Sequence, residues 1–386
     1  MSLQNRQLTS MKNILFAVFV SLASLELFSF VATKYELLLF NDIPEVYQPR
    51  NSGFDWRTQK ESWGSWHKLN ATDRHRSSCF DVRYDSNDFG ARDTSFSYVK
   101  EKSQPRYILI GDSFAEGWGV DIENTAQAQL EKSLGIDVYN FGSDGYFGPV
   151  QYYLIYQNLA KKFDHDGIIL FFLPANDFTD NDFALWKNWH PTWYRPYYKK
   201  ANNGQYDIFY SDRAVKSEQY QDAQLSIIKR FLLRYTYSVN ALRTVKYLFS
   251  DNSIEKGGYS GYYDATLAQQ QAAIYFIEKI VTEAENKKVM ILVIPNQVDL
   301  AWIRSGRPYN DQYWYKTLLS LQAANSNVDV IDMAENMPGD YDDLFHRCDN
   351  HWDARGNLAA ASIIADRYRG SRSQASRLGG TAPSNR

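Results

Sequence analysis

The chain has few cysteines and little excess charge, and both shortages exclude classes of function. Its two cysteines, Cys79 and Cys348, lie far apart and form no Cys-x-x-Cys pair. A zinc site or a thioredoxin-like redox site therefore has no support, and no metal is expected. The formal net charge is −3 and the basic residues are scattered, so nothing indicates a nucleic-acid partner. The sequence also has no internal repeat, and its length allows one large domain or two ordinary ones.

A long apolar segment near the N-terminus predicts a membrane anchor or an export signal. Arg6 and Lys12 precede an apolar stretch from Asn13 to Ala32, which at roughly 20 residues is long enough to span a bilayer. The positive charge places the N-terminus in the cytoplasm and the rest of the chain outside it. Alternatively, Ser21-Leu22-Ala23 marks the cleavage site of a signal peptide. The remainder of the protein then lies in the periplasm or outside the cell, either anchored by one membrane pass or secreted.

Apolar runs that alternate with helical periods predict a parallel sheet covered by helices on both faces. Strands are expected at 106–110, 138–140, 167–173, 289–294 and 328–331, and helices at 124–134, 149–162, 264–286, 312–324 and 354–368. The continuous apolar run at 167–173 is typical of a strand that is covered on both sides. Asn124 is expected to cap the first of these helices.

Composition divides the chain around this core. Residues 1–33 form the anchor or signal segment, and residues 34–104 form an extension of loops and short strands packed on the core domain. The core domain spans 105–369, with an insertion at about 183–263 that is first aromatic and then helical in period. Residues 370–386 are rich in Ser, Arg and Gly, which predicts a disordered tail.

A serine lies where the first core strand ends. Gly111-Asp112-Ser113-Phe114 directly follows the apolar run 107–110, so the Ser113 hydroxyl is expected at the carboxyl edge of the sheet, where open α/β folds bind ligands. A nucleophilic serine needs a base and a group that orients the base. His351, in the loop before the last helix, is the best candidate for the base. Asp349 is close enough to fold back onto the imidazole and hold its tautomer.

Two further turns can supply hydrogen-bond donors to a developing oxyanion. The turn after the second strand contains Gly142 and Gly145, where the backbone can approach a reacting centre closely. The turn after the third strand contains Asn176, whose side-chain amide is a suitable donor. Either turn alone would be ordinary turn chemistry. Because they follow successive strands, the turns can converge with Ser113 on one point.

The four blocks together resemble the SGNH, or GDSL-type, hydrolases. The similarity covers about 105–368 apart from the insertion, and it rests on Gly-Asp-Ser-Phe at 111–114, Gly145, Asn176-Asp177, and Asp349 with His351. It implies a three-layer α/β/α, flavodoxin-like SGNH hydrolase fold with a Ser113–His351–Asp349 triad and no organic cofactor. It also implies an oxyanion hole made by the N–H groups of Ser113 and Gly145 and the Asn176 side chain.

The aspartate is one detail in which the sequence departs from the family pattern. Many members place it three residues before the histidine, but position 348 is a cysteine here and the spacing is two. The string Asp349-x-His351-Trp352 is also similar to the polysaccharide O-acetyltransferases of this superfamily, although in those the pair precedes the serine. Outside the cytoplasm disulfides are permitted, and we predict that Cys79 and Cys348 bond and hold the extension beside the site. The alternative is two buried free thiols.

The resemblance and the N-terminal segment imply a membrane-anchored serine esterase that faces outward. Its acyl-enzyme, most simply acetylated, would pass to water in an esterase or to a sugar hydroxyl in an O-acetyltransferase. An acylated carbohydrate is the favoured substrate, with Trp186, Trp189 and Trp193 as candidates for stacking on sugar rings; alternatively these residues form the core of the insertion. A second alternative is a non-catalytic protein of an envelope polysaccharide machinery.

Overall fold

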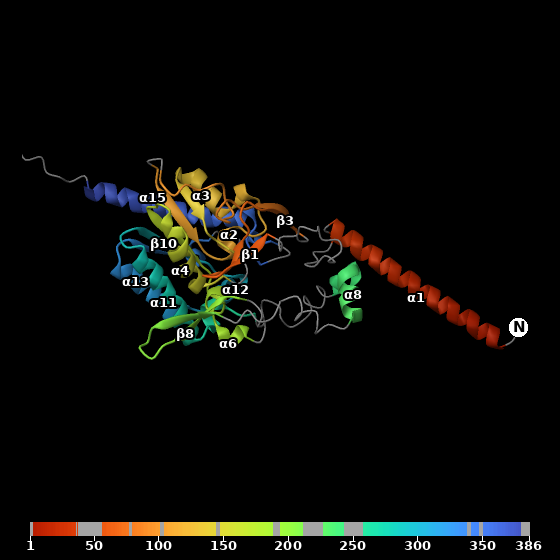
Figure 1. The fold of residues 1–386 in the computed structure, drawn as a ribbon. Helices are drawn as coiled ribbons and strands as arrows, with labels where there is room; N and C mark the ends of the chain where they lie inside the picture. The colour runs from red at the N-terminus through yellow and green to blue at the C-terminus, as the bar shows by residue number, and fades with distance from the viewer. Residues whose placement is uncertain are drawn as a thin grey trace, which may run out of the picture.

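The computed structural model places an α/β core at one end of a long N-terminal helix (Figure 1). The residues that it describes are 3–35, 37, 56–76, 79–100, 104–143, 147–187, 194–210, 227–242, 258–337, 341–346 and 350–379.

Five parallel strands form the central sheet. In chain order they are β5 (Arg106–Ile110), β6 (Asp137–Asn140), β7 (Gly167–Phe172), β10 (Lys288–Val293) and β11 (Val328–Asp332). Their order across the sheet is β11-β10-β7-β5-β6. The first strand in sequence thus lies between the second and the third, which is the flavodoxin-like arrangement. The predicted α/β fold with a central parallel sheet is confirmed.

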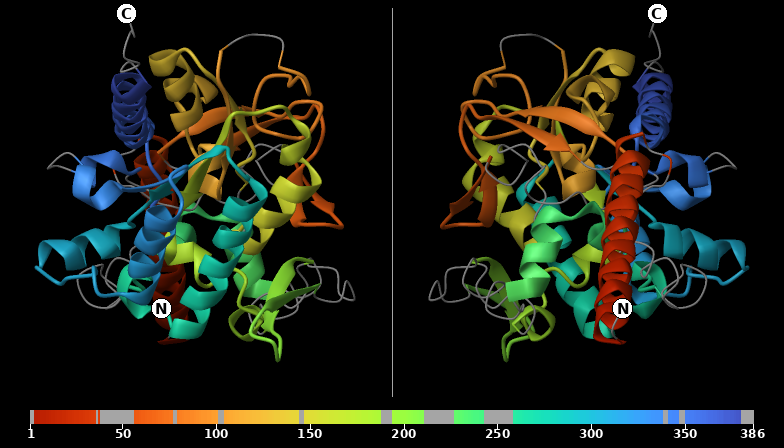
Figure 2. Two further views of the ribbon diagram at one scale, coloured as in Figure 1. Left: turned by 90° about the vertical axis from the view of Figure 1, so that its left-hand side faces the viewer. Right: turned by 90° about the vertical axis from the view of Figure 1, so that its right-hand side faces the viewer.

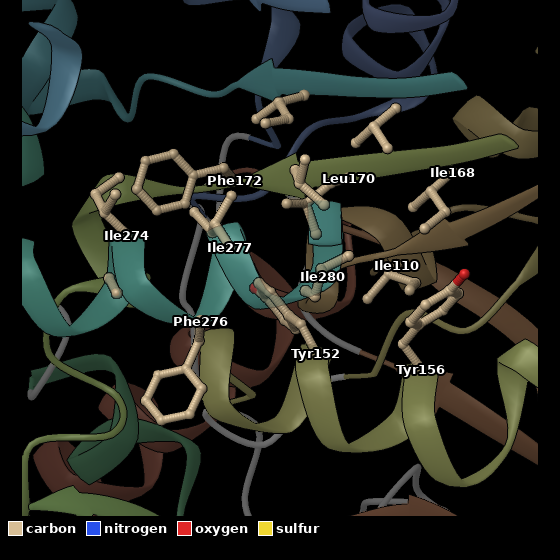
Figure 3. Close-up of a cluster of buried hydrophobic side chains, with 14 of the residues drawn as sticks. Ile110, Tyr152, Tyr156, Ile168, Leu170, Phe172, Ile274, Phe276, Ile277 and Ile280 are labelled. Atoms are coloured by element: carbon tan, nitrogen blue, oxygen red, sulfur yellow. The ribbon is translucent and has the colours of Figure 1, made fainter. Parts of the chain in front are cut away.

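Helices cover both faces of this sheet. One face carries α4 (Pro149–Asn158), α11 (Leu267–Glu283) and α13 (Tyr313–Ala324), and the other carries α3 (Ala126–Leu134) and α15 (Ala354–Gly379). All residues of β5 and β7 are buried. Because successive side chains of a strand point to opposite faces, Leu170 and Phe172 pack toward Tyr152 of α4 and Ile277 of α11 (Figure 3), whereas Phe171 faces the opposite layer.

Two helices begin later than the sequence pattern predicts. The cap of α3 is Thr125, whose hydroxyl accepts the Ala128 N–H at 3.3 Å. The expected cap, Asn124, instead ends a short 3-10 helix, Ile122–Asn124. Similarly, α11 begins after Thr266, which forms a capping box with Gln269. Serine, threonine, aspartate and asparagine are all favoured at the cap position, so a slightly weaker cap such as threonine can be used where the packing of the helix requires it.

The last helix is longer than predicted. Residues 370–379 continue α15, in contrast to the disordered tail expected from residue 370; residues 380–386 lie outside the described part of the chain. Arg367 bonds Asp329 of β11 at 2.6 Å, and the Ser371 hydroxyl reaches the same carboxylate at 3.5 Å. Extending an existing helix is far easier than starting one, so these contacts can carry the helix into a polar segment.

The extension and the insertion add small elements around the core. The extension contains two antiparallel hairpins, β1 (Arg57–Lys60) with β2 (Gly64–His67) and β3 (Thr72–Arg76) with β4 (Asp81–Asp85). The insertion contains α6 (Phe183–Trp186), the hairpin of β8 (Pro196–Lys200) and β9 (Tyr206–Tyr210), α8 (Ile227–Tyr235) and α10 (Gly261–Asp264).

The N-terminal helix α1 (Leu3–Lys34) projects away from the core (Figure 1), and in the right-hand view of Figure 2 it runs lengthwise in front of the domain. Its segment Met11–Lys34 is long and apolar enough to cross a membrane, and it is the one such helix among the described residues. Only 6% of its apolar window is buried. A core helix of a soluble protein would be largely covered, so this exposure favours a segment that meets lipid or is removed.

Gly261 allows the insertion to touch the core closely, and its replacement should destabilise the fold. A Cβ atom at this position would lie 2.1 Å from the backbone N of Ala175 and the backbone C of Pro174. We expect Gly261→Ala to lower the free energy of unfolding by about 3 kcal/mol, since neither backbone can move cheaply. Urea denaturation of the detergent-solubilised protein measures this change. Gly370→Ala is the control: nothing lies within 4 Å of its Cβ, and in a helix it should gain up to about 1 kcal/mol. Equal effects would contradict the prediction.

Candidate active site

Ser113 begins a one-turn helix at the carboxyl end of β5. This helix, α2 (Ser113–Glu116), is capped by the Asp112 carboxylate, which accepts the Phe114 N–H at 3.0 Å. It ends at Gly117, whose φ of 83° is in the left-handed region that glycine adopts at low cost. Ser113 is 7% exposed. Its position is therefore set by one cap at each end of a single turn.

His351 lies against Ser113. Its Nε2 is 2.7 Å from the Ser113 Oγ, although the two residues are 238 positions apart in sequence. This is the distance of a good hydrogen bond. The loop that carries His351 is held by an antiparallel bridge between Phe345 and Trp352 and by a bond from the His346 N–H to the His351 carbonyl at 2.8 Å. The structure thus brings together the serine and the histidine that the sequence singles out.

Aromatic rings fix the plane of the imidazole. Trp118 stacks on His351 with centroids 5.0 Å apart and an interplanar angle of 26°, and the Phe114 ring lies 5.1 Å away. Both aromatic residues come from α2 or the turn after it. The same short segment therefore positions both Ser113 and the ring of His351.

Asn176 also reaches this point. It lies in α5 (Pro174–Asp177), directly after β7, and its Nδ2 donates a hydrogen bond to Asp112 Oδ2 at 3.1 Å. Burial raises the pKa of Asp112 to about 6. The adjacent Asp177 is buried and accepts bonds from the Leu173 N–H and the Tyr152 hydroxyl at 2.8 and 2.7 Å. Asp177 thereby fixes the turn, while Asn176 bonds Asp112, the residue next to Ser113.

The second glycine-containing turn packs against α2. The Asn140 side chain accepts the Gly142 N–H and donates to the Ala115 carbonyl, both at 2.8 Å. A Cβ on Gly142 would lie 2.3 Å from the backbone N of Glu116. Gly142 is therefore needed for close approach. Gly145, the predicted oxyanion donor, lies outside the described residues.

Several other predicted site residues are also outside the described part: Asp349, Cys348, Trp189 and Trp193. Their roles stay predictions. Cys79 is disulfide-bonded, and Cys348 is the one other cysteine of the sequence. Trp186 is described, and it is half-buried, with its Nε1 donating to the Thr179 carbonyl at 2.8 Å and the Arg195 guanidinium 5.2 Å above its ring. Those contacts are typical of a packing residue in the insertion.

The extension contributes residues that the sequence pattern does not reveal. His75 packs edge-on against Trp118 at 4.2 Å, and the Tyr84 hydroxyl accepts the Gly119 N–H at 2.8 Å. The buried Arg92 donates to three carbonyls at and after the end of α2, those of Glu116, Gly117 and Val120. In the sequence, only the high Arg and Trp content of the extension pointed to contacts with the site. That composition does not indicate which residues make the contacts.

A buried acid and histidine lie beneath α2. The Glu116 carboxylate is 3.7 Å from His67 Nε2, and neither side chain is exposed. Burial raises the pKa of Glu116 to about 7 and lowers the pKa of His67 to about 3, so both directions favour the uncharged forms. His67 is stacked between Trp56 and Trp66, with centroids at 4.1 and 5.0 Å. Together these buried, stacked side chains support α2 from below.

Among the described residues, no group of three or more His, Cys, Asp or Glu side chains could hold a metal ion. The described site is thus a serine and a histidine in contact, with an amide donor nearby. A set of this kind can carry out acyl transfer.

Comparison with known proteins gives one family match. Residues 249–383, which include His351, match the family model described as SGNH hydrolase-like domain, acetyltransferase AlgX. No curated protein matches the chain.

Three solved structures are similar at low sequence identity. A lipase/acylhydrolase from Enterococcus faecalis is 13% identical over 69% of this chain and 97% of its own, with a TM-score of 0.37. A lipolytic G-D-S-L family member from Veillonella parvula is 14% identical over 68% and 96%, with a TM-score of 0.34. A family 3 carbohydrate esterase from Clostridium thermocellum is 11% identical over 68% and 94%, with a TM-score of 0.35.

The buried Asp112 should make stability depend on pH in a definite direction. Its folded pKa of about 6 lies above the ordinary 3.8, so its contribution is fully present below pH 4 and is lost as the pH rises through 6. The Asp112→Asn variant lacks this titration. Relative to the parent, its free energy of unfolding should rise by about 3 kcal/mol between pH 4 and pH 8.

Denaturant unfolding at several pH values measures this slope. Asp88→Asn, at an exposed position of the extension, is the matched control. A difference between parent and Asp112→Asn that stays constant across this range would contradict the prediction.

Proposed function

We propose that this chain, of which residues 249–383 match an SGNH hydrolase-like family model, is an outward-facing serine esterase that removes acyl groups, in the first place acetyl groups, from a carbohydrate. The observation that carries this proposal is the 2.7 Å contact between Ser113 Oγ and His351 Nε2. Acyl esterase and acetyltransferase activities are the general activities of this kind of domain. We add three proposals to this general activity: that the substrate is a carbohydrate ester, that the acyl group passes to water, and that the domain lies outside the cytoplasm.

The proposed reaction follows from the donors and acceptors around Ser113. His351 Nε2 takes the hydroxyl proton as Ser113 Oγ attacks the ester carbonyl, and the proton then passes to the leaving alcohol. The acyl-enzyme that remains is cleaved by water, with His351 again acting as base. Asp349, two residues before, is proposed to hold the other imidazole nitrogen. The proposed Cys79–Cys348 bond would restrain that loop.

Asn176 is proposed to stabilise the oxyanion. Its amide nitrogen carries two hydrogens, and Asp112 accepts one of them at 3.1 Å. This bond fixes the direction of the second hydrogen. With the N–H groups of Ser113 and the proposed Gly145, the amide then offers three donors to the tetrahedral intermediate.

A second candidate function is O-acetyl transfer to a polysaccharide. The observation that favours it is the match of residues 249–383 to a family model described for an acetyltransferase. The acyl-enzyme would be the same, and a sugar hydroxyl would replace water. A non-catalytic role within an envelope polysaccharide machinery is less well supported, because the serine and histidine are in bonding contact.

We also propose that α1 anchors the protein in the membrane by a single pass, with the core domain in the periplasm. The apolar, uncovered segment Met11–Lys34 supports this location. The basic residues Arg6 and Lys12 near its start favour a cytoplasmic N-terminus. Cleavage of the segment as a signal would leave a secreted enzyme with the same active site.

Ester hydrolysis should depend on Ser113. We expect Ser113→Ala to lower the kcat for a chromogenic acetyl ester at least about 10³-fold, because the nucleophile is removed. A fluorophosphonate probe should label the parent and fail to label this variant. Ser362→Ala, an exposed serine of α15 whose hydroxyl bonds the Leu358 carbonyl, should match the parent in both assays. Absence of turnover and of labelling in the parent would exclude catalysis. If turnover occurs, products formed with an added glycan acceptor distinguish transfer from hydrolysis.

Loss of the Asn176 amide should affect kcat more than KM. We expect Asn176→Ala to lower kcat by about 10²-fold, since an oxyanion donor acts mainly in the transition state. Steady-state kinetics on the same ester separate the two constants. Asn203→Ala, in the exposed β8–β9 turn, is the control. A rise in KM at unchanged kcat would instead assign Asn176 to substrate binding.

A further inference from the structure

The helical part of the insertion lies against α1 rather than against the sheet. We propose that α8 and the helical turn after it, residues 237–242, lie in the outer interface of the bilayer beside α1, so that the domain meets the membrane at two elements. This inference rests on the proposed anchoring by α1. In Figure 1, α8 is beside the end of α1 that is nearer the core, and the right-hand view of Figure 2 shows both on the same side of the molecule.

Glu26 joins the two elements. Its carboxylate accepts the Tyr237 N–H at 2.6 Å, the Ser238 N–H at 3.0 Å and the Ser238 hydroxyl at 2.6 Å. An acidic side chain inside an apolar span is expensive unless it has specific partners. Here the partners are the first N–H groups of a helical turn, which need acceptors in any case. The contact therefore explains both the acid within α1 and the place of the insertion.

The level of this contact along α1 fits the boundary of a bilayer. Lys34 and Tyr35 end the apolar segment, and the Lys34 ammonium lies 5.7 Å from the Tyr35 ring. Such residues are typical of the interface with water. Glu26 is eight residues earlier, which at about 1.5 Å per residue is about 12 Å along the helix. The turn at Tyr237 then lies near the junction of headgroups and acyl chains, where interfacial helices bind.

The end of α8 has its backbone groups bonded within the protein. Asn240 Nδ2 donates to the carbonyls of Leu233 and Thr236 at 2.9 and 2.8 Å, and the Thr236 hydroxyl donates to the Leu232 carbonyl at 2.7 Å. In water these carbonyls could be hydrated at little cost. In an environment poor in water they require internal donors, and Asn240 and Thr236 supply them.

One face of α8 is apolar and uncovered. Its exposed members are Ile227, Ile228, Phe231 and Tyr235, at 78, 73, 57 and 41% exposure. Three of the four recur at intervals of four residues and so line one side of the helix. The sequence interleaves Lys229, Arg230 and Arg234, as in helices that lie on anionic lipid.

The apolar face is also continuous with the membrane segment. Phe30 of α1 meets Tyr237 edge-on, with ring centroids 5.2 Å apart, and Ala32 packs with Ala241. Because Leu27 and Phe28 of α1 are exposed, lipid that surrounds α1 at this level would also meet α8. This continuity favours a bilayer over a second protein as the occupant of the face.

The test places an environment-sensitive fluorophore on single introduced cysteines of the full chain in proteoliposomes of phosphatidylcholine and phosphatidylglycerol. Phe231→Cys reports on α8, Leu15→Cys reports on α1, and Asn203→Cys in the exposed β8–β9 turn is the aqueous control. The unsubstituted chain gives the background labelling. We expect doxyl-labelled lipids to quench the fluorophore at 231 at least half as strongly as at 15, with little quenching at 203.

Each other outcome overturns the inference in a distinguishable way. Quenching at 15 with none at 231 rejects the contact of α8 with lipid and leaves the anchor intact, whereas quenching at neither position rejects both. If the fluorophore at 231 is protected from quenching, and the protection disappears when the protein is diluted into excess lipid, the face is covered by a second copy of the chain.

The role of Glu26 is tested in the same vesicles. Glu26→Ala should reduce quenching at 231 at least twofold and leave quenching at 15 unchanged, because the turn at Tyr237 loses its acceptors. Glu123→Ala, an exposed acid of the core, is the matched control. Unchanged quenching at 231 in Glu26→Ala would show that Glu26 does not hold α8 at the membrane.

Discussion

The hydrogen bond between Ser113 and His351 is the contact on which the rest of the site depends. It joins the turn after the first strand of the sheet to the loop before the last helix. The position of Ser113 is set by the caps at the two ends of α2. The position of His351 is set by the strand bridge in its loop and by the stacked Trp118 ring. The sheet therefore determines the distance between Ser113 and His351, because it holds the turn after β5 and the loop before α15 in fixed positions.

The residues around α2 include buried carboxyl groups, whose burial costs folding free energy. Asp112, Glu116 and Asp177 are all buried within the same region, and burial raises the pKa of each. Perturbed carboxyl groups of this kind concentrate at functional sites, where stability is given up for a fixed polar arrangement. Arg92 compensates in part, since its positive charge opposes the rise in the Glu116 pKa. Arg92 also bonds three carbonyls at and after the end of α2 and so links the extension to this turn. The extension is therefore a structural component of the site.

The sheet and the core of the site could be predicted because they follow a general rule. Apolar strands that alternate with helices give parallel strands, and the turns after such strands meet at one edge, which brings together Ser113, Asn176 and His351. Contacts of the extension could not be predicted, because Arg92 and His75 belong to segments without periodicity. The cap of α3 and the end of α15 were misplaced for a different reason. Adjacent residues cap equally well in the first case, and in the second a contact with Asp329 from a distant strand extends the helix.

The bonds made by Glu26 have a consequence for how the chain can vary. A generic apolar leader would still carry the domain across a membrane, but it would leave the N–H groups of Tyr237 and Ser238 without acceptors. Conversely, deleting the helical insertion would remove the donors that bond the Glu26 carboxylate of α1. Three strands of the sheet, β5, β6 and β7, lie between α1 and the helical insertion in sequence. The Glu26 bonds nevertheless make the two segments depend on each other. We expect chimaeras that exchange only one of them to assemble poorly, while those that exchange both retain the native architecture.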